Sequence, residues 1–535
     1  MFRPLATLSL AVTVAAVLSG CDGTPEQQSA TGAPAQAQTG GVLRVAFDGD
    51  PNCIDPQQAG NNTALNVGRQ LVDSLTDQDP QTAEILPWLA ERWEVSDDSR
   101  QFTFHLREGV TFADGAPLDA AAVKANIEAI IGLGGLAQLA GTYLAGLESV
   151  DVTGPLSVRI SFKQANAQFL QASSTMSLGL LSPATLKRTP EERCQGALVG
   201  SGPFTVKGFE HNKLVRLDVR PDYNWPSSIA GHQGRAWLNA IEFHILPESG
   251  VRLGSLLSGQ IDVNTSVPVQ DEAVLEAQGV PSINRPNPGI VFNLTANVSR
   301  APLDELAVRQ ALNKAIDRSQ FQGVISRYQK PATSVLASST PYYQDLRSHL
   351  VYDPEGAGKL LDDAGWHKGA DGWRQRDGKR LGFALDYWQA TTPVLELVQQ
   401  QLRKVGVELR LNKSTIGQVS LLQTSLNYEL WFFNLTRADP DVLRTVFLSS
   451  GRNVNVRGAS PLDQVLLDSA ASLDPQKRGA LIQQASAELL DQGHVIPLVE
   501  AATVTAFRDV VRGLHYEAST RLQFYDTWLA QPGSH

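Results

Sequence analysis

The sequence predicts an α/β protein with more than one domain. Strand and helix signals alternate along the whole chain, and its 535 residues are too many for one compact core. No internal repeat of fixed period is visible. Mixed strands and helices in a chain of this length favour α/β lobes over a solenoid or an all-β stack.

The first twenty residues are predicted to be a secretory signal peptide. Arg3 supplies a positive charge, and an apolar run of about fourteen residues extends from Leu5 to Leu18. This run is shorter than the roughly 20 residues that a membrane-spanning helix needs. The string LSGC at residues 18–21 resembles the bacterial lipobox, which implies that Cys21 is acylated and becomes the new N-terminus. The alternative is an ordinary signal peptide with a chance cysteine.

Residues 21–40 are predicted to be a flexible linker that carries the lipid anchor. From Asp22 to Gly40 the segment holds no large apolar residue and is rich in Gln, Ala, Thr, Gly and Pro, so it cannot bury enough surface to fold. Asp22 resembles the signal that keeps some lipoproteins on the inner membrane of Gram-negative bacteria. The expected location is the periplasmic side of the cytoplasmic membrane.

Alternating apolar and polar residues predict half-buried strands in the body of the chain. Four such patterns begin at Phe102, Val158, Val215 and Val407. The apolar positions are Phe102, Phe104 and Leu106, then Val158, Ile160 and Phe162, then Val215, Leu217 and Val219, and finally Val407, Leu409 and Leu411.

Amphipathic helices are predicted between these strands. Asp119 can cap one of them, and Pro302 stands early in another. The predicted apolar stripes are Val123, Ile127, Ile130 and Ile131 in the first helix and Val308, Ala311, Leu312, Ala315 and Ile316 in the second.

Composition and charge exclude some classes of partner. The net charge of −10 comes from interspersed acids and bases without a basic stripe, so no nucleic-acid partner is expected. Beyond Cys21 two cysteines remain, Cys53 and Cys194. In an oxidising compartment they can form a disulfide, or each can be a separate buried thiol.

Familiar catalytic and metal-binding motifs are missing from the sequence. It contains no HExxH, GxSxG, GK[ST] phosphate loop or CxxC, and its nine histidines are scattered. Asp439 and Asp441 bring two carboxylates close together, but a Pro-bearing acidic turn explains them better than a catalytic or metal pair. No catalytic residue, metal site or cofactor is therefore expected.

Six segments, in order, resemble the family 5 solute-binding proteins, the peptide- and nickel-binding group of ABC importers. By themselves these segments have structural explanations: glycines such as Gly202, for example, let two backbones approach closely. The segments are GVLRVAFDGDPNCIDPQ (41–57), residues 85–126, GSGPF (200–204), FNLTAN (292–297) with VRQALNKAIDR (308–318), YDPEGAGKLLDDAGW (352–366) and the DPD segment near 440.

The resemblance implies a fold like that of the type II periplasmic binding proteins. Two α/β lobes joined by a hinge close on a ligand, and an extra subdomain is inserted in the first lobe. The expected boundaries are 41–269 for lobe I with the insertion at about 63–190, 270–495 for lobe II, and 496–535 for the return to lobe I. Cys53 and Cys194 flank segments that this fold brings to the cleft wall, so the resemblance predicts that they form a disulfide.

The resemblance also implies a receptor that captures peptides or peptide-like solutes and delivers them to an ABC permease and its ATPase. A monomer that makes or breaks no bond is expected. A nickel-chelate or metallophore receptor is the alternative, although residues 132–147 carry no basic residue and Asp441 stands where nickel-binding relatives have His. A periplasmic hydrolase is more remote, because no nucleophile–base pair is visible.

The expected ligand contacts follow from the same resemblance. Peptide-binding relatives hold the α-amine with an aspartate four residues before the proline of the acidic turn, and this chain has Thr436 there. Either Asp439 reaches the amine, or Arg437 meets an anionic group with its bidentate fork. The remaining candidate ligand-binding residues are Ser201 and Gly202 of the glycine turn, the aromatics Tyr223, Tyr387 and Trp388, and the amides Asn293 and Asn434.

Overall fold

The computed structural model describes residues 37–388, 392–415, 418, 421–422 and 425–531. The predicted signal peptide, Cys21 and nearly all of the predicted linker lie outside the described residues. No helix in the described part of the chain is long and apolar enough to cross a membrane.

A mixed seven-stranded sheet forms the first lobe. Its central strand β1 runs parallel to β10 and β11, and both of its faces are covered. This explains why Leu43, Val45, Ala46 and Phe47 are all buried rather than alternating. The strand order is β12 (Ser282–Pro286), β22 (Ala502–Phe507), β11 (Val263–Asn264), β1 (Val42–Phe47), β10 (Ala240–Ile245), β9 (Leu214–Val219) and β8 (Phe204–Glu210).

A four-stranded antiparallel sheet and several helices separate β1 from β8 in the sequence. The sheet order is β4 (Ala90–Val95), β5 (Gln101–Leu106), β7 (Ser157–Phe162) and β6 (Leu147–Gly154). The helices of this part are α1 (Asn62–Leu71), α2 (Ala120–Leu133), α3 (Ala140–Tyr143), α4 (Phe169–Ala172), α5 (Pro183–Leu186) and α6 (Pro190–Cys194), and the hairpin β2 (Thr76–Gln78) with β3 (Ile85–Pro87) precedes the sheet. Two helices of the first lobe, α7 (Ser249–Leu257) and α8 (Val269–Ala277), follow β10.

A six-stranded sheet forms the second lobe, with an apolar core on each face. Its order is β14 (Lys330–Pro331), β21 (Val495–Glu500), β13 (Gly289–Ala296), β20 (Leu430–Thr436), β18 (Gly382–Tyr387) and β19 (Glu408–Lys413). The helices are α9 (Leu306–Lys314), α10 (Pro354–Asp363), α11 (Thr392–Lys404), α13 (Val442–Phe447), α14 (Pro461–Ala471) and α15 (Pro475–Asp491). A small sheet holds β15 (His367–Lys368), β16 (Arg374–Arg376) and β17 (Lys379–Arg380).

The chain ends in two short ribbons, whose side chains Val511, Tyr516, Leu522 and Phe524 join the core of the first lobe. The ribbons pair β23 (Val511–Arg512) with β26 (Trp528–Leu529) and β24 (His515–Tyr516) with β25 (Leu522–Gln523). Short 3-10 helices are η1 (Gly134–Leu136), η2 (Met176–Leu178), η3 (Arg318–Gly323) and η4 (Arg347–His349).

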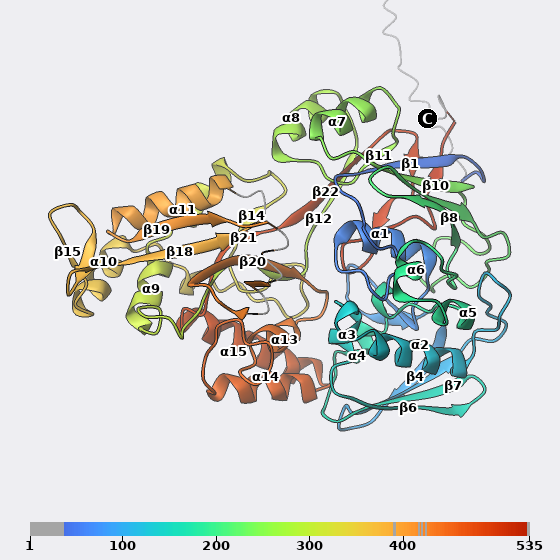
Figure 1. The fold of residues 1–535 in the computed structure, drawn as a ribbon, viewed down its shortest axis with the longest axis horizontal. Helices are drawn as coiled ribbons and strands as arrows, with labels where there is room; N and C mark the ends of the chain where they lie inside the picture. Colours follow the sequence, from blue (N-terminus) through green and yellow to red (C-terminus); the bar gives the residue numbers. More distant parts are fainter. Residues whose placement is uncertain (1–36, 389–391, 416–417, 419–420, 423–424, 532–535) are drawn as a thin grey trace, which may run out of the picture. The chain divides into compact units, whose positions relative to one another are not determined.

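Two antiparallel strands carry the chain between the large sheets. β12 and β22 pair side by side, and β13 continues from β12 while β22 continues from β21 (Figure 1). β12 belongs to the first sheet, although lobe II was expected to begin at residue 270. β21 belongs to the second sheet, although lobe II was expected to end at residue 495. We therefore place the two crossings at residues 287–288 and 501. Short strand signals cannot reveal which sheet a strand joins.

The four predicted strands are confirmed as β5, β7, β9 and β19. Asp119 caps α2 by accepting a hydrogen bond from the Ala122 N–H at 2.8 Å, as expected. Two details of the predicted helices are wrong. Ile131 is 49% exposed because it lies past the edge of the buried stripe, and Pro302 precedes α9, which begins at Leu306.

The glycine turn of residues 200–204 packs on the backbone at the end of α1. A Cβ at Gly200 would lie 1.9 Å from the carbonyl oxygen of Leu71, and one at Gly202 would lie 2.6 Å from the carbonyl carbon. The N–H of Gly202 donates to that carbonyl oxygen at 3.0 Å. The close approach therefore requires glycine at both positions for reasons of packing.

Asp73, just after α1, is the centre of a fully buried polar cluster. Its Oδ1 accepts from the Tyr223 hydroxyl at 3.0 Å, its Oδ2 accepts from Trp225 Nε1 at 3.1 Å, and its own N–H donates to Ser201 Oγ at 2.9 Å. Burial raises the pKa of Asp73 to about 7, although these hydrogen bonds oppose the shift. Ser201 and Tyr223, both expected at the ligand, therefore serve this core cluster.

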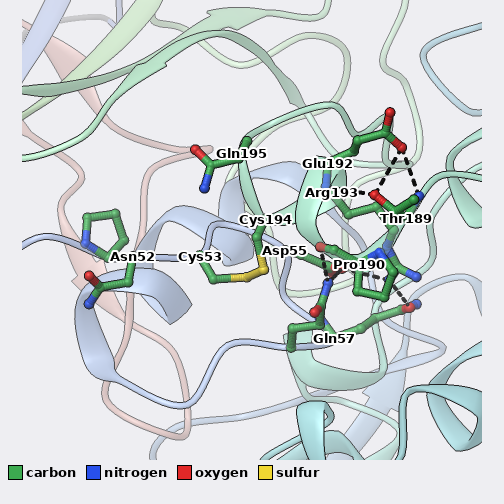
Figure 2. Close-up of a disulfide and its surroundings, with 12 residues drawn as sticks. Asn52, Cys53, Asp55, Gln57, Thr189, Pro190, Glu192, Arg193, Cys194 and Gln195 are labelled. Atoms are coloured by element: carbon green, nitrogen blue, oxygen red, sulfur yellow. Dashed lines mark hydrogen bonds and ion pairs between the residues drawn. A yellow bond between two sulfur atoms is a disulfide. The ribbon is translucent and has the colours of Figure 1, made fainter.

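The disulfide between Cys53 and Cys194 joins the loop after β1 to the end of α6 (Figure 2). A buried ion pair lies beside it, with Asp55 Oδ2 at 2.7 Å from Arg193 Nη2. The same guanidinium nitrogen donates to Gln57 Oε1 at 2.7 Å. These contacts attach α6 to the loop that follows β1.

We expect the disulfide to close a long loop, since the two cysteines are 141 residues apart. Thiol labelling of denatured, unreduced Cys21→Ala protein should modify neither Cys53 nor Cys194, and reduction should make both reactive. Replacing both by serine should lower the free energy of unfolding by about 2–4 kcal/mol. Two labelled thiols without reduction would contradict the pairing.

Asp73 should make stability depend on pH in a direction opposite to that of most carboxylates. Its pKa of about 7 exceeds the ordinary value of 3.8, so between these values the folded protein holds a proton that the unfolded chain has lost. The free energy of unfolding should therefore fall as the pH rises from 4 to 7, by up to about 1.4 kcal/mol per unit, and then level off.

Denaturant titrations at several pH values should show this slope reduced in Asp73→Asn. A matched variant of an exposed aspartate on α10, Asp363→Asn, should keep the wild-type slope. Equal pH profiles for wild type and Asp73→Asn would rule out the raised pKa.

Candidate functional site

A cavity of about 870 Å³ is lined by β12, one of the two crossing strands, and by residues of both lobes. This volume is within the range of roughly 300–1,000 Å³ typical of small-molecule sites. The first lobe contributes residues 78–85 of the β2–β3 hairpin, Ala167, Leu170, Gln171, residues 283–286 of β12, Leu514, His515, Tyr516 and Ala518. The second lobe contributes residues 338–342, Ala438, Asp439, Ser472, Leu473 and Arg478.

The two lobes also contact each other directly. The N–H of Ala167 donates to the carbonyl of Ala470 at 2.8 Å, and Ser99 Oγ donates to the carbonyl of Ala471 at 3.3 Å. Since Ala470 and Ala471 end α14, this helix meets the part of the first lobe that holds Ser99 and Ala167. The cavity is therefore flanked by a hinge on β12 and β22 and by a direct contact between the lobes.

Asp439 lines this cavity. Its side chain is already paired, because Arg478 of α15 donates to its two oxygens at 2.6 and 3.1 Å. Asp439 Oδ1 also accepts the N–H of Asp441 at 2.8 Å, and Asp441 pairs with Arg444 at 2.7 Å. The acidic turn is thus neutralised by two arginines inside the second lobe.

Arg437 is buried and reaches across to the first lobe. Its Nη2 donates to Thr142 Oγ1 of α3 at 2.8 Å, and its guanidinium carbon lies 4.4 Å from the centre of the Tyr143 ring. A cation over an aromatic face in a desolvated position is stabilising. The structure therefore gives Arg437 partners in the opposite lobe and does not put it on the cavity wall.

The other expected ligand contacts are mostly core residues. Asn293 is fully buried in β13, where its Nδ2 donates to the carbonyls of Val291 and Phe433. Tyr387 packs in the core of the second lobe. Trp388 follows β18 and is 37% exposed, and Asn434 lies half-buried in β20. None of these four lines the cavity.

Tyr223, with its core partner Trp88, borders a separate cavity of about 40 Å³. Gly202 and Ser201 line neither of these two cavities. Of the nine residues expected at the ligand, the structure thus brings Asp439 to the large cavity. The physical reason is that polar residues in strands and turns often satisfy backbone groups of the core.

Arg285 on β12 is a cavity residue that the sequence analysis missed. Its Nη1 donates to the carbonyl of Glu517 at 2.6 Å and its Nη2 to the carbonyl of Pro80 at 2.7 Å. Burial lowers the pKa of Arg285. No sequence motif marks it, since a single arginine in the short strand SINRP looks like a solvent-facing residue.

Comparisons with known proteins point to one protein family. The family described as "Bacterial extracellular solute-binding proteins, family 5 Middle" matches residues 84–455. The glutathione-binding protein GsiB of Salmonella paratyphi A is 26% identical over 513 residues, covering 91% of this chain and 94% of that protein.

Two solved structures share the fold over nearly the whole chain. NikA from Brucella suis in complex with Fe(III)-EDTA has a TM-score of 0.78 at 22% identity, covering 91% of this chain and 100% of that one. A dipeptide-binding protein from Pseudoalteromonas sp. SM9913 in complex with Met-Leu has a TM-score of 0.77 at 21% identity, with the same coverage. The two-lobed α/β fold and the family match together establish that this chain belongs to family 5 of the bacterial extracellular solute-binding proteins.

Proposed function

We propose that this protein is the receptor of an ABC importer for short peptides or peptide-like solutes. The cavity at the crossing strands carries the proposal, because its walls come from both lobes and its volume of about 870 Å³ suits a ligand of a few residues. The relative named for glutathione binding supports a peptide-like solute.

Capture would use hinge motion about β12 and β22. A ligand held between the lobes stabilises the form in which the lobes contact each other, and that form would be recognised by a permease. The protein would act as a monomer, and its role would be to bind the solute, with no bond made or broken. ATP hydrolysis by a separate subunit would drive transport.

We expect glutathione or tri-alanine to bind purified protein with one-to-one stoichiometry in calorimetry. A saturating ligand, at about a hundred times its Kd, should stabilise the fold by about 2.7 kcal/mol by mass action. The complex should also show a smaller radius of gyration in X-ray scattering than the free protein.

Native mass spectrometry of the freshly purified protein tests the identity of the ligand independently, through the mass of any compound that co-purifies with it. A co-purified mass that fits a peptide would support the proposal. A nickel chelate or metallophore mass, together with no heat of binding for either peptide, would replace it with the metal-chelate alternative. Turnover of peptides or chromogenic esters would instead point to a hydrolase.

The proposed location rests on Cys21, which lies outside the described residues. We expect acylation of Cys21 to hold the body at the periplasmic face of the cytoplasmic membrane. Cys21→Ala should move the protein from the membrane fraction to the soluble periplasmic fraction while leaving ligand affinity unchanged. Wild-type protein found entirely in the soluble fraction, or mutant protein found entirely in the membrane fraction, would refute the anchor.

A further inference from the structure

The charged side chains that line the cavity are not equally compensated. Asp439 and Arg478 neutralise each other across two short hydrogen bonds. Asp79 Oδ1 accepts the N–H groups of two residues in its own hairpin loop, at 2.7 and 2.8 Å, and Glu84 is exposed at the end of that loop. Arg285 remains, a half-buried cation on the strand that forms the hinge.

The hydrogen bonds of Arg285 go to neutral groups only. Its two hydrogen bonds go to the main-chain carbonyls of Pro80 and Glu517, and no carboxylate in the described part of the chain forms an ion pair with it, although the charges of Glu517 and Asp79 act on it from a greater distance. Its Nε–H makes no hydrogen bond with the described part of the chain. Withdrawing a cation from water is costly unless an anion compensates it. A ligand anion in the cavity would add a direct ion pair to the more distant charges of Glu517 and Asp79.

Two glutamines that line the same cavity have side-chain oxygens that accept no hydrogen bond from the described part of the chain. Gln78 and Gln171 are both 4% exposed and both line the cavity. The Oε1 atom of each is buried without a hydrogen-bond partner in the described structure. Buried acceptors are nearly always satisfied by protein, water or ligand donors, and a ligand with N–H groups in the cavity would supply such donors.

We propose that Arg285 binds a carboxylate of the captured solute, while Gln78 and Gln171 accept hydrogen bonds from its N–H groups. This inference rests on the proposed function and names the chemistry of the ligand: a compound that carries a free carboxylate and amide or amine N–H groups, as a short peptide does. Arg285 replaces Arg437 as the residue that recognises the anionic group.

A purely structural role for Arg285 predicts a different effect of its substitution from the one that ligand recognition predicts. Its bonds to Pro80 and Glu517 tie the β2–β3 hairpin to the C-terminal segment, and losing them would lower stability whatever the ligand carries. A recognition role instead makes the effect of Arg285 depend on the carboxylate of the ligand. The decisive measurement therefore varies residue and ligand together.

The probes are tri-alanine, its C-terminal amide, glutathione, and the two glutathione derivatives in which one carboxylate at a time is a carboxamide. Calorimetry would compare wild type, Arg285→Gln and Arg285→Lys, with Arg347→Gln as a control on an exposed arginine paired with Asp345. Thermal unfolding of each variant would verify that it is folded. If Arg285→Gln does not fold, the wild-type amide comparison and Arg285→Lys still decide the question.

For a peptide that wild type binds, we expect neutralising one carboxylate to raise Kd at least tenfold, which corresponds to about 1.4 kcal/mol. The same neutralisation should change Kd less than threefold in Arg285→Gln, and Arg285→Lys should lose affinity for the free acid because it lacks the bidentate fork. Arg347→Gln should match wild type throughout.

Failure of the proposed peptide receptor and failure of the role of Arg285 give different results. If wild type binds neither tri-alanine nor glutathione, the proposed peptide receptor falls and this inference falls with it. If wild type binds a peptide but no carboxamide weakens it, or if the penalty is the same in Arg285→Gln as in wild type, the peptide receptor stands and the role of Arg285 is overturned.

Discussion

The pairing of β12 with β22 is the constraint on which the rest of the structure depends. In the described chain the large sheets are connected where β12 leads into β13 and where β21 leads into β22. The Asn287 N–H donates to the carbonyl of Ala501 at 2.9 Å, and Thr503 Oγ1 donates to Asn287 Oδ1 at 2.7 Å, so the two crossings are bonded to each other. A paired ribbon can bend, but its strands cannot separate without losing these bonds.

The position of the cavity follows from this constraint. The edge strand β12 and its neighbour β22 in the first sheet continue into β13 and β21 of the second, and residues of β12 form part of the cavity wall. Any solute held there contacts both lobes and the hinge at once. Binding is thereby coupled to the angle between the lobes, because contacts to both walls are complete only when the lobes are close.

Buried ion pairs lie within each lobe, and a half-buried arginine lies on a strand that connects the lobes. Asp55 pairs with Arg193 in the first lobe, and Asp439 pairs with Arg478 in the second. Such pairs hold local geometry more than they add stability. At the hinge, Arg285 has carbonyl partners alone. Arg252 and Arg309 also donate to carbonyls, but Arg285 lines the cavity, where a ligand can reach it.

The sequence by itself determined the family, the α/β class and several elements, because these depend on local patterns. Alternation marked β5, β7, β9 and β19, and Asp119 marked the start of α2. Ordered motifs identified the fold, and the resemblance led to the pairing of Cys53 with Cys194 that the structure contains. In each case neighbouring residues or whole segments carried the information.

Only the tertiary structure decided which polar side chains reach the cavity. Ser201, Tyr223 and Asn293 looked like ligand contacts, but each satisfies a buried group of its own lobe. Arg285 carries no motif, and its importance arises from residues as distant in the sequence as Pro80 and Glu517. A residue's type fixes which hydrogen bonds it can make, whereas its partners depend on how distant segments pack, and one sequence does not specify that packing locally.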